Sequence, residues 1–198
     1  MKRTLVVVGL VSAIAATGHA QAPQGRGGGR GPAAPAAPVI TTLGGDIRAD
    51  WARTRALITG IVEAMPDDKF SFKPTPAEQT FAERVLHVAT TDLFILQALG
   101  GKTAAPMINQ KAATKAELLA ALKQTFDYGD AVIQEFGDQQ WIERVAPPPF
   151  LGPSASRVRI IYFDMQHSED MYGQFVVYVR LNGVTPPASR PRNAPPEP

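Results

Sequence analysis

The segment from residue 157 to residue 187 constrains the fold of this 198-residue chain more than any other stretch. Its apolar residues follow the spacing of an amphipathic helix, and Asn182-Gly183 with prolines just beyond is typical of a helix end. The pattern therefore predicts one long helix over residues 157–182. His167 and Met171 are four residues apart, so they lie one above the other on the same helical face.

Three earlier segments also carry apolar residues at helical spacing, and they cover residues 46–65, 80–99 and 114–136. Two of them begin with a threonine followed three residues later by a glutamate, Thr80 with Glu83 and Thr114 with Glu117. This spacing is the signature of a capping box, in which the two side chains bond each other's backbone at a helix start.

A long connection precedes the last helix, and its triple proline at 147–149 excludes a helix there. Within it, residues 141–145 are predicted to form a short extended piece. Four helices of about 20 residues with one long Pro-rich connection indicate an all-α fold, a four-helix bundle over residues 40–188.

The two ends of the chain differ in composition from this predicted bundle. Residues 1–20 combine Lys2 and Arg3 with an apolar run and small residues before the expected cleavage point, which is the pattern of a signal peptide. Residues 21–39 are a Gly/Pro/Ala-rich linker and residues 189–198 a tail, both predicted to be disordered.

The predicted signal peptide makes the protein an exported one, periplasmic or extracellular. The chain contains no cysteine, so neither a lipid-modified cysteine nor a disulfide is available to it. After signal cleavage we expect no membrane association.

Charge argues against a nucleic-acid partner. The whole chain has a formal net charge of +2, but residues 40–188 hold 14 basic and 17 acidic residues. A nucleic-acid interface needs a basic patch on the folded domain, and this balance does not favour one. A small-molecule partner is compatible with the sequence, which leaves the oligomeric state open, a dimer included.

Three stretches together resemble a known family. They are FSFKPTP before the second helix, ERVLHVA within it, and YGQFVVYVRLNGVTPPAS at the end of the last helix. In this order they resemble the DinB-like superfamily, also called the DinB/maleylpyruvate-isomerase-like four-helix bundles, over about residues 42–188.

The resemblance implies a divalent metal, often zinc or nickel, held by one histidine from the second helix and two from the last. His87 matches the first of these ligands and His167 the second. Met171 stands where the third histidine is expected. Thioether sulfur is a soft ligand that suits Cu(I) and is poor for Zn, Ni or Mn, so the match stops at the residue that completes the site.

Two interpretations of the site follow. In the first the metal site is degenerate, the protein holds no metal, and Met171 packs in the core beside histidines that bond each other or neighbouring polar groups. In the second, a carboxylate replaces the third histidine, and Asp170, three residues after His167, is the best placed of Asp164, Glu169 and Asp170. Asp92, five residues from His87 and off its face, is a poorer candidate.

These interpretations give two hypotheses for function. The first is a bundle that binds a small molecule or a partner, with Gln174 and Tyr172 lining its pocket. The second is a divalent-metal-dependent hydrolase or transferase that uses His87, His167 and a carboxylate. Relatives that act with low-molecular-weight thiols depend on cytosolic cofactors, which an exported chain would not meet.

Overall fold

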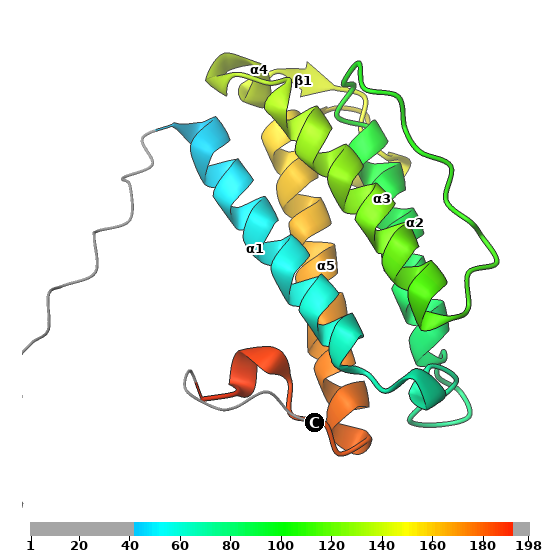
Figure 1. Ribbon diagram of the computed structural model, residues 1–198. Coiled ribbons are helices and arrows are strands. Elements are labelled where there is room, and N and C mark those ends of the chain that lie inside the picture. Colours follow the sequence, from blue (N-terminus) through cyan, green and yellow to red (C-terminus); the bar gives the residue numbers. More distant parts are fainter. Residues whose placement is uncertain (1–41, 192–198) are drawn as a thin grey trace, which may run out of the picture. The chain divides into compact units, whose positions relative to one another are not determined.

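The computed structural model describes residues 42–191, and four long helices dominate it (Figure 1). They are α1 (Leu43–Ala64), α2 (Phe81–Gln97), α3 (Lys115–Gln134) and α5 (Arg157–Leu181). The shorter elements are η1 (Asp67–Lys69), α4 (Asp138–Ile142), β1 (Arg144–Val145), η2 (Pro149–Leu151), β2 (Ala155–Ser156) and η3 (Pro187–Ser189). The predicted leader, the linker and residues 192–198 of the tail lie outside the described residues.

The four long helices form the bundle that the sequence predicts. Helix α1 packs against α3 and α5, and α2 packs against the same two helices from the other side of the bundle (Figure 1). Helices α1 and α2 are consecutive in the chain but lie across the bundle from each other. The contact between α2 and α5 joins the helix that carries His87 to the helix that carries His167.

Local capping sets where these helices begin and end. Both predicted capping boxes are present: Thr80 and Glu83 start α2, and Thr114 and Glu117 start α3. Helix α1 begins earlier than predicted, at residue 43, because the side chain of Thr42 accepts a hydrogen bond from a backbone amide of its first turn.

Helix α5 ends as predicted, and the backbone explains why a glycine stands there. Gly183 has a φ of 76°, a left-handed conformation that costs glycine little. The amide of Val184 bonds the carbonyl of Val179 at 3.0 Å, and the amide of Gly183 bonds the carbonyl of Arg180 at 3.0 Å. These two bonds make a Schellman motif, which satisfies the last carbonyls of the helix.

Buried aromatic side chains fix the relative positions of the helices. The rings of Phe81 on α2 and Phe175 on α5 lie 5.1 Å apart, and those of Trp51 on α1 and Phe126 on α3 lie 5.3 Å apart. All four side chains are almost completely buried. Each such burial stabilises the fold by roughly 1.5–3 kcal/mol or more. The Phe81–Phe175 pair therefore holds α2 against α5.

The long connection differs in part from its prediction. Residues 138–142 form the short helix α4, so the prediction of an extended piece over 141–145 is wrong for its first two residues. Trp141 lies in that helix and is fully buried, and its ring centroid is 5.3 Å from that of Phe136. The burial of this side chain outweighs any local preference of the segment for a strand. Residues 144–145 are extended and pair antiparallel with residues 155–156.

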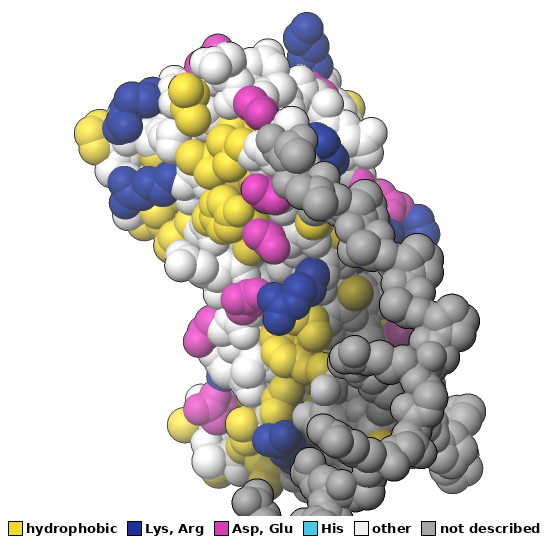
Figure 2. Space-filling model, turned by 90° about the vertical axis from the view of Figure 1, so that its left-hand side faces the viewer, with side chains coloured by type: hydrophobic (Ala, Val, Ile, Leu, Met, Phe, Trp, Pro, Cys, Tyr) yellow, Lys and Arg dark blue, Asp and Glu magenta, His cyan; other side chains and the backbone are white. Residues whose placement is uncertain are grey.

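The segment after α5 contains the short turn η3, which packs against α1. None of the helices within residues 42–191 is long and apolar enough to cross a membrane. On the face in Figure 2, separate basic and acidic side chains are scattered among apolar ones.

Candidate histidine site

The two histidines that the sequence singles out face each other across the α2–α5 contact. Nε2 of His87 lies 3.3 Å from Nε2 of His167, and the ring centroids are 5.2 Å apart. His87 is exposed, whereas the side chain of His167 is only 18% exposed. Oγ1 of Thr91, one turn after His87, lies 3.3 Å from its Nδ1. The pair is therefore a surface site with a partly buried inner member.

A buried aspartate holds the inner histidine. Oδ1 of Asp92 lies 2.7 Å from Nδ1 of His167, and Oδ2 accepts a hydrogen bond from Oγ of Ser168 at 2.6 Å. Asp92 is fully buried. A carboxylate bonded to one ring nitrogen fixes the tautomer and orientation of an imidazole, so Nε2 of His167 is directed toward His87.

The sequence makes Asp92 a poorer candidate than Asp170, but Asp92 is the carboxyl group that contacts His167. It does lie off the face of His87, but its partner is on α5 rather than on its own helix. A signal was present, because Asp92 falls in the apolar stripe of α2 with Val85, Val88, Ala89 and Leu96, all of which are buried. A charged residue inside such a stripe is buried only when it is paired, which points to a partner on the facing helix.

Burial shifts the pKa values of this site. It raises the pKa of Asp92, an effect that the hydrogen bonds from His167 and Ser168 oppose. Burial also lowers the pKa of His87, and the adjacent imidazole of His167 lowers it further. Around neutral pH His87 is therefore an uncharged imidazole with a nitrogen accessible to solvent.

A second buried carboxyl, Asp164 on α5, lies behind the site without a hydrogen-bond partner for either oxygen among the described residues. Burial, with Asp92 nearby, raises its pKa well above the ordinary value of 3.8. The uncharged acid is thus strongly favoured in the folded protein. Asp164 is one of the acids near His167 in the sequence, but this environment disfavours the ionised form that a metal ligand needs.

We expect Asp164→Asn to flatten the pH dependence of stability. Asp164 binds its proton more tightly in the folded protein than in the unfolded chain. The free energy of unfolding therefore falls as pH rises above about 4. It falls by up to about 1.4 kcal/mol per pH unit until the carboxyl group ionises in the folded protein. Asparagine does not titrate. Urea unfolding at pH 4, 6 and 8 should show that the stability of the variant relative to the wild type increases as pH rises. The variant should keep some pH dependence of its own, because Asp92 also titrates. Parallel curves would contradict this reading of Asp164.

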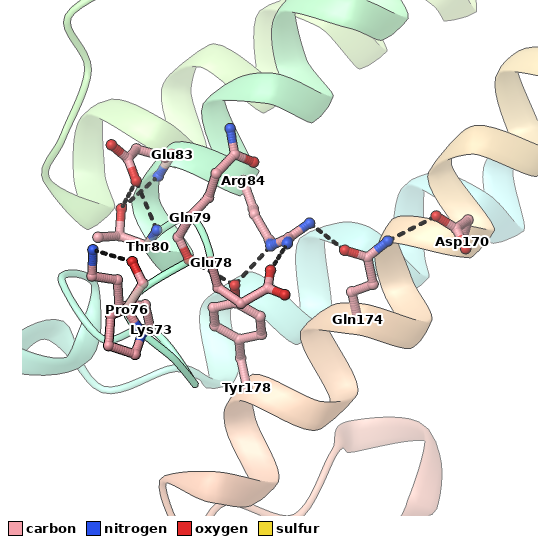
Figure 3. A network of polar contacts seen from close by, with 10 residues as sticks. All are labelled: Lys73, Pro76, Glu78, Gln79, Thr80, Glu83, Arg84, Asp170, Gln174 and Tyr178. Atoms are coloured by element: carbon pink, nitrogen blue, oxygen red, sulfur yellow. Dashed lines mark hydrogen bonds and ion pairs between the residues drawn. The ribbon is translucent and has the colours of Figure 1, made fainter.

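Met171 stands one turn after His167 and is 4% exposed. The carboxylate considered as its replacement is directed elsewhere: Oδ2 of Asp170 accepts a hydrogen bond from Nε2 of Gln174 at 2.8 Å (Figure 3). Oε1 of Gln174 in turn accepts a bond from the guanidinium of Arg84. Nε of Arg84 also bonds the hydroxyl of Tyr178 at 2.7 Å. Asp170 is therefore the end of a polar chain anchored on Arg84.

The two residues expected to line one pocket line two different hollows. Gln174 borders a hollow with Arg84, Val177 and Tyr178. Tyr172 borders a mainly apolar one formed by α1 and the segment around Pro187. Neither of these hollows includes His87 or His167, so the structure does not bring the predicted lining residues together with the histidine pair.

The donor set meets part of what a metal requires. Two nitrogens bound at about 2.0–2.1 Å to one tetrahedral zinc lie about 3.3–3.4 Å apart, and the two Nε2 atoms have that separation. The Asp92 contact is the support that a ligating histidine commonly has. Within residues 42–191, however, no group of three His, Cys, Asp or Glu residues is arranged to hold a metal. The residues thus do not fit the three-ligand zinc or nickel site that the resemblance implies.

Comparisons with known proteins agree with this fold. A solved DinB-like protein from Bacillus cereus ATCC 10987 is similar, with a TM-score of 0.65 and 17% sequence identity, and the match covers 74% of this chain and 96% of that one. The solved DinB-like protein YjoA from Bacillus subtilis is also similar, with a TM-score of 0.57 and 20% sequence identity, and the match covers 71% of this chain and 94% of that one. At these identities the likeness shows the fold alone.

The sequence comparisons identify the family. The uncharacterized protein YjoA of Bacillus subtilis (strain 168) is 21% identical over 131 residues, which cover 66% of this chain and 85% of YjoA. The model of the DinB superfamily matches residues 50–175, well over half of the chain. The protein described here therefore belongs to the DinB superfamily.

Proposed function

We propose that this protein is an exported binding protein that holds a small ligand, a molecule or an ion, at the His87–His167 pair, and that it does not carry out divalent-metal catalysis. The observation that carries the proposal is Met171, a buried thioether one turn after His167 where a third histidine or carboxylate ligand would be needed. A catalytic zinc site requires three protein ligands and one open position, and this pair supplies two.

The carboxylates near the pair support the same conclusion. Asp92 is committed to His167 and Ser168, and Asp170 to Gln174. A hydrolase or transferase that used His87, His167 and either Asp92 or Asp170 would first have to break one of these arrangements. Removing Asp92 from His167 would also release the ring that it orients.

The pair is well suited to binding. His87 presents an uncharged imidazole to solvent, and His167 is held in one orientation by a buried carboxylate. Ring nitrogens of this kind donate or accept a single hydrogen bond, or give a lone pair to a soft ion. Export rests on the leader pattern in residues 1–20, and it would place this site outside the cytoplasm.

Thermal unfolding in the presence of Zn²⁺, Ni²⁺ or Mn²⁺ tests the proposal. A divalent ion at about 100 times its Kd would stabilise the folded state by about 2.7 kcal/mol, or roughly 5–10 °C in Tm for a domain of this size. We expect each ion to shift the wild type no more than it shifts His87→Ala. A rise of several degrees that depends on ion concentration and disappears in His87→Ala would overturn the proposal.

A further inference from the structure

We propose that His87, His167 and Met171 together bind a single Cu(I) ion. This inference rests on the proposed function, because it names the ligand of the same histidine pair. It starts from the feature that fails for zinc and nickel. A thioether is a poor third ligand for zinc or nickel beside two imidazole nitrogens, but thioether sulfur is among the ligands that select Cu(I), and imidazole suits copper too.

The structure positions the two nitrogen donors for one shared ion. The Nε2 atoms of His87 and His167 face each other at 3.3 Å. Nδ1 of His167 is engaged by Asp92, which leaves its Nε2 lone pair for an ion. The buried carboxyl group of Asp92 also holds the ring of His167 in the orientation that a shared ion would need.

The third donor comes from the same helix as His167. Met171 follows it by one turn, so its side chain belongs to the same face of α5. At 4% exposed it is shielded from water, unlike the surface residue Met107, which is 94% exposed. A flexible, unbranched thioether can adjust to an ion without a backbone change. Shielding also limits oxidation of the sulfur.

Competition for Cu(I) against the chromophoric chelator bathocuproine disulfonate, without oxygen, tests this directly on the purified exported protein. We expect the wild type to withdraw one Cu(I) per chain. Met171→Leu and His87→Ala should each weaken the affinity by about tenfold or more, the least that loss of a direct ligand should cost. Met165→Leu is the matched control, because Met165 lies on the same helix and is also 4% exposed, but sits two residues before His167. It should bind Cu(I) like the wild type.

Two results would overturn the copper site: a wild type that withdraws no Cu(I), or a Met171→Leu variant that withdraws as much as the wild type. Met165→Leu controls for general destabilisation of the fold. Both leucine variants conserve side-chain volume, so each should lower the free energy of unfolding by less than about 1.5 kcal/mol. Failure here leaves the proposed function standing if zinc and nickel also fail to stabilise the fold. Zinc or nickel binding that requires His87 would instead overturn the proposed function.

Discussion

Met171→His should raise the affinity of this protein for Zn²⁺ or Ni²⁺ by about a hundredfold or more. Complete four-ligand zinc sites are worth about 10–16 kcal/mol, so one added ligand contributes on the order of 3 kcal/mol, and each 1.4 kcal/mol is a factor of ten. The other two ligands are already in place, since the two Nε2 atoms are separated by one edge of a zinc tetrahedron.

Isothermal titration of wild type, Met171→His and Met171→Leu with Zn²⁺ measures this gain. The leucine variant fills the same buried space without a donor atom and should match the wild type. His87→Ala added to Met171→His should remove the gain, which ties it to the pair. If Met171→His binds zinc no better than the wild type, then α2 and α5 do not hold the two histidines as described.

Gly129→Ala should destabilise the fold by about 1–3 kcal/mol or more, although alanine is the better helix former by up to about 1 kcal/mol. A Cβ at Gly129 on α3 would lie 2.2 Å from Cζ2 of Trp51 and 2.8 Å from its Cε2. Trp51 cannot easily move, because it is 1% exposed and its Nε1 donates to Oδ1 of Asp130 at 2.8 Å. The substitution therefore forces apart α1 and α3.

Gly173→Ala is the matched control, because Gly173 is also inside a helix and a Cβ there has no atom within 4 Å. It should stabilise the fold by roughly 0.5–1 kcal/mol. Urea unfolding of the two variants should thus give changes of opposite sign. A Gly129→Ala protein as stable as Gly173→Ala would mean that Trp51 does not pack against the α3 backbone.

Much of the fold could be predicted because its determinants are local. The starts of α2 and α3 depend on residues three apart, Thr80 with Glu83 and Thr114 with Glu117, and the end of α5 depends on Gly183. His87 and His167 could be singled out in the sequence by residue type and by the order of motifs. The bundle then brings them together through the α2–α5 contact.

The remaining features could not be predicted because they depend on contacts between helices. Asp92 and Ser168 are 76 positions apart and meet only when α2 packs on α5. The short helix α4 forms where Trp141 is buried against the bundle, which no local preference predicts. Spacing alone placed Asp170 near His167, but its carboxylate is drawn away by Gln174 and, through it, by Arg84 on α2.

Elemental analysis by mass spectrometry of the protein, purified without a His-tag or chelator, tests the central claim most directly. The claim is that the His87–His167 pair with Met171 is not a zinc or nickel site. It predicts zinc, nickel and manganese each far below one atom per chain, in the wild type and in His87→Ala alike. One zinc or nickel per chain in the wild type, absent from His87→Ala, would contradict it.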